Sequence, residues 1–98
     1  IPNSNKFSAY TLTAADAGTV VYISSGGVTV PYNVMSNAQV VTIINNSNTS
    51  QAITQASSMT MYNTADGSSG NRTLGARGMA TIWFMSTGLC YISGAGLS

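Results

Sequence analysis

Short segments rich in β-branched and aromatic residues recur along this 98-residue chain, with turn residues between them at intervals of about 8–12 residues. The two clearest are Gln39–Asn45 and Met79–Met85. No segment of useful length has the 3.6-residue apolar period of an amphipathic helix. This pattern predicts one all-β domain, a small β-sandwich or barrel-like knob, over residues 9–98.

Shorter segments complete the expected set of strands, because they are bounded by Gly, Pro, Asn and Ser. These strands are Tyr10–Thr13, Thr19–Ser24, Val28–Val30, Gln51–Gln55, Met59–Tyr62, Thr73–Leu74 and Leu89–Ser93. Ser25-Gly26-Gly27 separates two of them, which predicts a hairpin. Residues 1–8 are expected to form a linker and Gly94–Ser98 a glycine-rich tail. Around Asp16 we expect a turn or a single helical turn.

The two clearest strands carry apolar residues on both faces. In Gln39–Asn45, Val40 and Ile44 fall on one face and Val41 and Ile43 on the other. A strand of a one-sided sheet alternates apolar and polar residues, whereas a strand buried on both faces does not. We therefore expect both faces of these strands to be covered, one by the domain core and the other by a neighbouring subunit.

Charge is scarce: the chain has three Lys and Arg residues, two Asp residues, no Glu and no His, where an ordinary soluble domain has about a quarter of its residues charged. Without histidine there is no Ser-His-Asp or Cys-His arrangement. Asp16 and Asp66 are the only candidates for the carboxylate pair of a glycosidase. Clusters of metal ligands are also missing. We therefore expect no enzymatic activity, no metal and no cofactor.

Nucleic acid and membranes are also excluded as partners by the sequence. The cations are scattered, whereas binding to phosphates needs several clustered Lys or Arg residues. The apolar runs are far shorter than the roughly 20 residues of a membrane helix, so no membrane insertion is expected. Few charges also leave strand edges unprotected against aggregation, which favours a closed sheet or an oligomer.

Four single residues are given structural interpretations. Asp16 is expected to accept backbone hydrogen bonds in its turn. Cys90, the only cysteine, is expected to be a buried and inert thiol. Trp83 is expected to pack in the core or at a subunit interface. Arg77 is expected to pin a loop to a carbonyl group or to Asp66.

The polar stretch Tyr62–Thr73 is the best candidate for a ligand site, because long loops on rigid β scaffolds are where binding residues gather. It combines an aromatic ring, amides, a carboxylate and a guanidinium, which are groups that hold sugar hydroxyls. The candidate binding residues are Tyr62, Asn63, Asp66, Asn71 and Arg72. The alternative is a plain solvated loop in which Asp66-Gly67 forms a turn.

Several short motifs together resemble a module found near the C-termini of bacteriophage tail fibres and related virion fibres. The motifs are Tyr10-Thr11-Leu12-Thr13, Asp16-Ala17-Gly18, Val28-Thr29-Val30-Pro31, Val41-Thr42-Ile43-Ile44-Asn45-Asn46-Ser47, Arg72-Thr73-Leu74, Gly78-Met79-Ala80-Thr81-Ile82 and Tyr91-Ile92-Ser93-Gly94-Ala95-Gly96-Leu97. The resemblance covers nearly all of residues 8–98. It implies a β-rich homotrimer at the distal, extracellular end of a fibre on the virion, and residues 1–8 would then link it to the fibre shaft.

Two functions follow as expectations. The first is a non-catalytic receptor-binding tip that recognises a bacterial surface polysaccharide or lipopolysaccharide, with a neutral or weakly charged ligand because few charges are available to pair. The alternative is a purely structural trimerisation or folding cap, or a virion-surface knob, without a ligand of its own. A depolymerase or esterase is a third class, which the residue inventory disfavours. Because the chain starts at Ile1 rather than Met, we also expect it to be part of a longer protein.

Overall fold

The structure, a computed structural model, describes residues 3–35 and 38–98. The described chain is all-β apart from one short 3-10 turn, η1 (Ala14–Asp16). Its strands are β1 (Asn3–Lys6), β2 (Tyr10–Thr11), β3 (Val20–Ile23), β4 (Val28–Val30), β5 (Gln39–Asn45), β6 (Gln51–Gln55), β7 (Thr60–Asn63), β8 (Arg72–Ser86) and β9 (Leu89–Leu97). The expected all-β class is confirmed.

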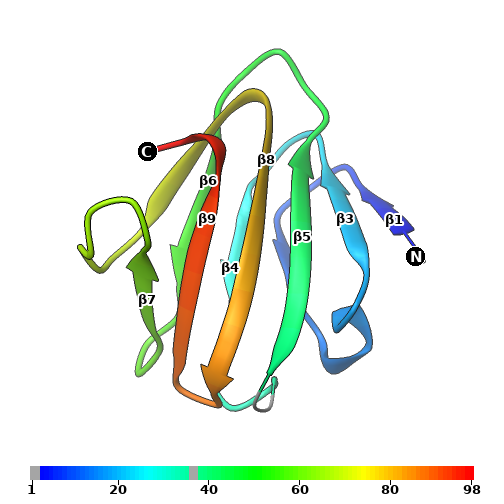
Figure 1. The fold of residues 1–98 in the computed structure, drawn as a ribbon. Helices are drawn as coiled ribbons and strands as arrows, with labels where there is room; N and C mark the ends of the chain where they lie inside the picture. Colours follow the sequence, from blue (N-terminus) through cyan, green and yellow to red (C-terminus); the bar gives the residue numbers. More distant parts are fainter. Residues whose placement is uncertain (1–2, 36–37) are drawn as a thin grey trace.

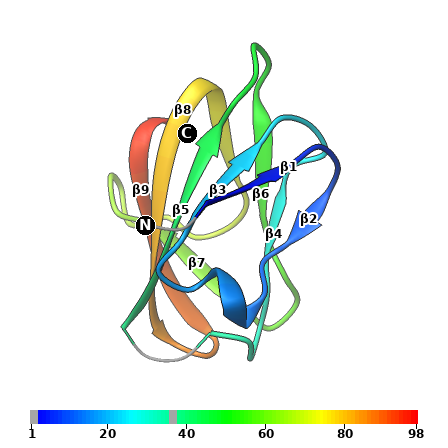
Figure 2. The same ribbon diagram turned by 90° about the vertical axis from the view of Figure 1, so that its right-hand side faces the viewer.

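The strands form one sheet that curls into a nearly closed, barrel-like shape (Figures 1 and 2). Strand order along the main path is β1-β3-β5-β8-β6-β4-β2, and β9 pairs with both β8 and β7. Successive strands alternate between two layers, so that β1, β3 and β5 run parallel in one layer while β2, β4 and β6 run parallel in the other. The first six strands therefore wind as a flattened coil.

Strand β8 joins the two layers. Its first part pairs with β6 through Leu74 and Gln51, and its second part pairs with β5 through Thr81 and Thr42. The register against β9 shifts between Leu74 and Met79, where the strand bulges. The expected turn at Gly75–Gly78 is thus an irregularity within one bent strand, because a bulge lets a strand turn a corner without ending.

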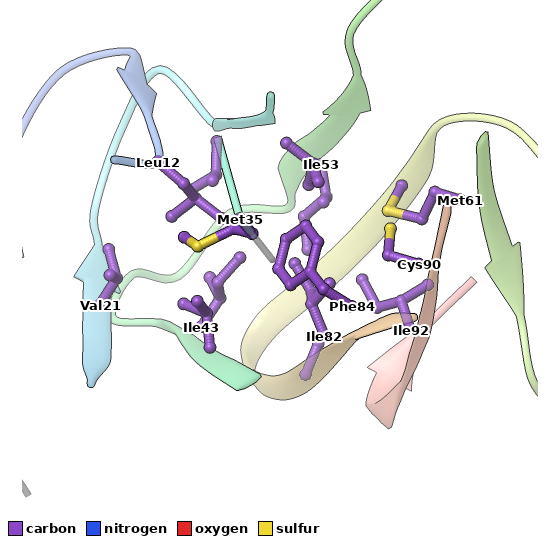
Figure 3. Packing of buried hydrophobic residues seen from close by; sticks show 14 of the residues in the cluster. Leu12, Val21, Met35, Ile43, Ile53, Met61, Ile82, Phe84, Cys90 and Ile92 are labelled. Atoms are coloured by element: carbon purple, nitrogen blue, oxygen red, sulfur yellow. The ribbon is translucent and has the colours of Figure 1, made fainter. Parts of the chain in front are cut away.

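The core fills the space between the layers (Figure 3). It is built from alternate residues of the strands, such as Val41 and Ile43 of β5 and Ile82 and Phe84 of β8. Met61 of β7 lies opposite Cys90 of β9 in register and both are fully buried. The burial expected for Cys90 is confirmed.

The hairpin expected around Gly26-Gly27 is not formed. β3 pairs with β1 and β5, and β4 pairs with β2 and β6, so these glycines carry the chain from one layer to the other. Both have positive φ angles, and a Cβ on Gly27 would lie 2.6 Å from the carbonyl oxygen of Ala52. Glycine is needed here for close backbone packing between strands, a role that a local turn signal does not reveal.

The two ends of the chain also differ from expectation. Residues 3–6, expected as part of a linker, form β1 and pair in parallel with β3; residues 1–2 lie outside the described part. The expected tail Gly94–Ser98 is mostly strand, since β9 continues to Leu97 and pairs with β8 as far as Leu74. Strand pairing uses backbone groups, so neither segment needed an apolar pattern to join the sheet. Within the described residues there is no helix of the length and apolarity needed to cross a bilayer.

Candidate functional site

The loop that was expected to bind a ligand is held together by hydrogen bonds of its own. Asp66 Oδ1 accepts from the backbone N–H of Ser68 (2.9 Å) and from its hydroxyl (2.7 Å), and these two bonds lower the pKa of the Asp66 carboxyl. Arg72 donates from one terminal nitrogen to the Ser68 hydroxyl (3.2 Å) and from Nε to the carbonyl oxygen of Asn71 (2.8 Å). Ser68 therefore links the carboxylate and the guanidinium on the exposed side of the loop.

The two amide side chains of the predicted site stabilise the loop ends. Asn63 is buried, and its Oδ1 accepts from the backbone N–H of Ala65 (3.2 Å). Asn71 Oδ1 accepts from the backbone N–H of Gln55 in β6 (2.9 Å). This bond ties the end of the loop to the layer formed by β2, β4 and β6. Both contacts hold backbone positions, so these amides have structural roles, and their part in ligand binding stays a prediction.

Tyr62, the fifth predicted residue, pairs through its backbone with Ser69 of the loop in an isolated antiparallel bridge. It projects from β7 on the side opposite to the buried Met61 and Asn63, and its ring lies next to that of Tyr91 in β9. The centroids of the two rings are 5.5 Å apart and their planes are tilted by 30°. The structure thus groups Asp66 and Arg72 around Ser68, and places Tyr62 on the surface of the sheet.

That surface, here named the outer face, is made by the outward side chains of β3, β5, β8, β9 and β7, the strands seen in front in Figure 1. Its members are Val20, Tyr22, Val40, Thr42, Ile44, Met79, Thr81, Trp83, Met85, Tyr91, Ser93 and Tyr62. Trp83, Met79 and Met85 are each about half exposed. Exposed apolar side chains that gather on one face of a protein often mark a contact or binding surface.

The expectation that both faces of β5 and β8 are buried is therefore met on one side only within the single chain. Val41 and Ile43 face the core, whereas Val40 and Ile44 are half-buried on the outer face. Trp83, expected in the core or at an interface, is 48% exposed. Whether a neighbouring subunit covers it is a matter of assembly, which stays a prediction.

Three rows of side chains cross the outer face because the strand registers align them. Val40, Trp83, Tyr91 and Tyr62 are paired in succession across β5, β8, β9 and β7. Val20, Thr42, Thr81 and Ser93 form the next row, and Tyr22, Ile44 and Met79 form the third. Sequence reasoning did not identify Trp83 and Tyr91 as surface residues. Their alternation with the buried Phe84 and Cys90 was the signal that could have done so.

Arg77 stabilises a corner of the fold. It has a left-handed backbone conformation (φ 60°) at the β8 bulge, and its guanidinium donates to Asn46 Oδ1 (3.0 Å) and Asn48 Oδ1 (3.1 Å). Beside it, the buried Asn45 donates through Nδ2 to the carbonyl oxygens of Leu74 and Gly75 (both 3.0 Å). As expected, Arg77 pins a loop, but it does so through two amide side chains.

Asp16 accepts hydrogen bonds at one carboxylate oxygen from three groups. They are the Tyr10 hydroxyl (2.6 Å), the Thr13 backbone N–H (2.7 Å) and the Thr13 hydroxyl (3.3 Å). Asp16 is 7% exposed, and the ammonium group of Lys6 lies 4.3 Å from the centre of the Tyr10 ring. The structural role expected for Asp16 is confirmed by these bonds.

We predict that Asp16→Ala lowers the free energy of unfolding by about 0.5–2 kcal/mol, the usual cost of losing a side-chain cap. The change would leave ligand binding intact, since Asp16 lies outside the outer face. Chemical denaturation followed by circular dichroism measures the first effect. Asp16→Asn, which keeps one acceptor oxygen, is the matched control and should lose less. Unchanged stability together with lost binding would contradict the structural role.

Burial raises the pKa of the Cys90 thiol to about 12 from an ordinary value of 9.0. Well below pH 9 the thiol is protonated in both the folded and the unfolded chain and has no effect. Above pH 9 the unfolded thiol loses its proton first, so the folded state should lose up to about 1.4 kcal/mol per pH unit until about pH 12. Denaturation between pH 9 and 10 tests this, because Tyr10, whose pKa is also raised by burial and by Asp16, titrates higher.

Cys90→Ala is the control for this pH effect. It removes the titrating group, so the loss of stability between pH 9 and 10 should flatten even though the variant starts from a lower stability. An identical pH slope in the two proteins would show that Cys90 does not cause it.

Among the described residues, no group of three side chains of the His, Cys, Asp or Glu type is placed to hold a metal ion, and no pocket is present. Asp16 and Asp66, the two carboxylate side chains, lie on different elements and both serve as local acceptors. Comparison of the chain with protein-family models, with curated proteins and with solved structures found no match. The feature that stands out chemically is the broad, uncharged outer face.

Proposed function

We propose that this chain is a non-catalytic receptor-binding domain at the tip of a bacteriophage tail fibre, where it assembles as a homotrimer on the virion and binds a neutral glycan of the bacterial surface. The observation that supports this proposal best is the outer face. It combines aromatic, aliphatic and hydroxyl side chains, and none of its members is charged. Three of the motifs that resemble virion fibres, at residues 41–47, 78–82 and 91–97, lie mainly on strands β5, β8 and β9 that build it.

Self-association would cover the part of the outer face over β3 and β5. Here Val20 and Tyr22 stand beside Thr42 and Ile44, with the register Val20–Thr42 and Tyr22–Ile44. Apolar surface patches are typical of interfaces between copies of one chain, and closed symmetry makes every copy bury the same surface. A trimer would also stabilise a small domain that has no disulfide.

The same surface favours a second candidate function, a trimerisation or folding cap without a ligand of its own. Both candidates need the oligomer, and only the first needs a glycan. They differ in whether the assembled protein retains purified bacterial surface polysaccharides.

We predict that the native chain has about three times its monomer mass by light scattering at micromolar concentration. Ile44→Asp should give a monomer, because a buried, unpaired carboxylate is strongly unfavourable in an interface. Ala52→Asp is the matched control: Ala52 is exposed on β6 in the other layer, and the variant should keep the native mass. A monomeric native protein would overturn the trimer.

Binding is tested with purified lipopolysaccharide and capsular polysaccharide immobilised on a surface. Retention of the trimer supports the receptor-binding function, and a trimer that binds none of these polysaccharides nor whole bacterial cells supports the structural cap. The same polysaccharides are examined for fragments after incubation. Release of fragments would contradict the non-catalytic assignment.

A further inference from the structure

The aromatic row, defined as Tyr62, Tyr91 and Trp83, crosses three neighbouring strands on the outer face. Trp83 of β8 lies opposite Tyr91 of β9, and Tyr91 lies opposite Tyr62 of β7. Neighbouring strands are about 4.8 Å apart, so the three rings extend over roughly 10 Å. Three aromatic residues paired in register provide a longer contact surface than a single isolated aromatic residue does.

The polar ends of these rings are open. Trp83 is 48% exposed and Tyr91 is 37% exposed. Within residues 3–35 and 38–98, no group accepts a hydrogen bond from the Trp83 indole N–H or pairs with the hydroxyls of Tyr62 and Tyr91. Tryptophan and tyrosine usually use these groups when they are buried, whereas here they are available to a ligand.

A row of hydroxyl groups runs beside the aromatic row. Thr42, Thr81 and Ser93 are paired across β5, β8 and β9, and the hydroxyls of Thr42 and Thr81 are 3.5 Å apart. Each is two residues along its strand from Val40, Trp83 or Tyr91. That separation is about 7 Å. Hydroxyl groups donate and accept hydrogen bonds, so they match the hydroxyls of a sugar whose ring lies on the aromatic row.

The charge around this surface selects the ligand class. The five charged residues all lie outside the rows of the outer face. Lys6 is in β1, Asp16 in η1, Asp66 and Arg72 are at the loop, and Arg77 is at the β8 bulge. An anionic sugar would find no cation among the rows, whereas a neutral sugar requires none.

We propose that the aromatic row binds a neutral pyranose oligosaccharide by stacking the apolar faces of its rings on Trp83, Tyr91 and Tyr62, with Thr81 and Ser93 bonding its hydroxyls. This inference rests on the proposed function and names the site and the ligand class for it. It places the binding site on the sheet and not on the loop. Tyr62 is the one residue of the site expected from the sequence that also belongs to this proposed site. The β7–β9 side of the outer face stays open when self-association covers β3 and β5.

The fluorescence of Trp83 can report binding directly, because Trp83 is the only tryptophan in the chain. Full-length chain is titrated with a panel of neutral hexaoses (cellohexaose, maltohexaose, isomaltohexaose and mannohexaose) and with hexagalacturonate as the charged control. We expect a saturable blue shift of tryptophan emission with at least one neutral hexaose and no shift with hexagalacturonate. No shift and no calorimetric heat with any neutral hexaose overturns the inference.

Variants locate the binding. Tyr91→Ala should weaken binding about tenfold or more, the loss expected when one aromatic platform is removed, whereas Tyr91→Phe keeps the ring and should lose little. Trp83→Ala, followed by calorimetry, should behave like Tyr91→Ala. Tyr32→Ala removes an exposed aromatic residue outside the row and should bind like the native chain. A loss caused by Arg72→Ala with none from Tyr91→Ala would place the glycan on the loop and overturn the inference.

The mass of each variant separates this inference from the proposed function. Tyr91→Ala and Trp83→Ala should keep the native mass by light scattering. If instead both variants dissociate and no hexaose binds the native protein, the aromatic row is a subunit contact, and the inference fails while the trimer stands. If the native protein binds bacterial polysaccharide but Tyr91→Ala binds it equally, only the inference fails. If it binds neither polysaccharide nor cells, the receptor-binding function itself fails.

Discussion

Replacing Phe84 by alanine is expected to lower the free energy of unfolding by about 3–5 kcal/mol. Phe84 is the largest of the fully buried side chains and lies within the cluster between the two layers (Figure 3). Its removal loses the apolar transfer energy of the ring and leaves a cavity that the surrounding strands, packed in two layers, can fill only in part. Small domains have total stabilities of about 5–15 kcal/mol, so a large part of the native stability would be lost.

Trp83→Ala is the matched control for this prediction. Trp83 precedes Phe84 in β8 and points to the outer face, where about half of its surface is already exposed. Its replacement should lower the stability by clearly less than the Phe84 change, by about 1–2 kcal/mol, because only half of the ring is buried. Urea denaturation of both variants measures the difference. Equal losses at the two positions would show that β8 is covered on both faces in the folded protein.

Gly94→Ala should also be severely destabilising, by about 3 kcal/mol, the upper end of the cost of overpacking. A Cβ at this position would clash with the carbonyl oxygen of Met79 and would lie 2.6 Å from the Cα of Ala80. Both atoms belong to the backbone of β8, so the strain cannot be relieved by a change of rotamer. The midpoint of thermal unfolding measures the effect.

Gly67→Ala is the comparison that isolates this contact. Gly67 has a positive φ angle (75°), but a Cβ there would meet nothing within 4 Å. The expected cost is therefore only the left-handed conformation, about 1–2 kcal/mol. A Gly94→Ala variant as stable as the native chain would mean that residues 94–98 form a free tail and do not pair in β9.

The candidate site could be predicted only in part from the local sequence, because its neighbours come from distant strands. Tyr62 was recognised because it begins a polar loop, but its neighbour on the surface is Tyr91, which lies 29 positions further along the chain and is paired by register. The amides Asn63 and Asn71 were chosen for their chemistry, which the fold uses for backbone contacts. Composition describes which groups are present, and only strand pairing decides which of them are neighbours.

Local pattern was enough to predict the strands themselves. β5 and β6 begin and end at the expected residues, because runs such as Val-Val-Thr-Ile-Ile suit an extended backbone and turn residues bound them. The all-β class, the short helical turn at Asp16 and the burial of Cys90 also depend on local properties of the chain. These features need no knowledge of which strand lies beside which.

Tertiary structure alone decided the winding of the chain. Parallel pairing of β3 with β5 joins residues 22 positions apart (Val20 and Thr42), and no local signal encodes such a contact. Gly26 and Gly27 predict a hairpin turn when only the local sequence is considered. The stability of the core instead places β3 and β4 in different layers. The reason is energetic: burying one face of every strand between two layers outweighs the single hairpin that the turn residues favour, because apolar burial grows with the whole area enclosed.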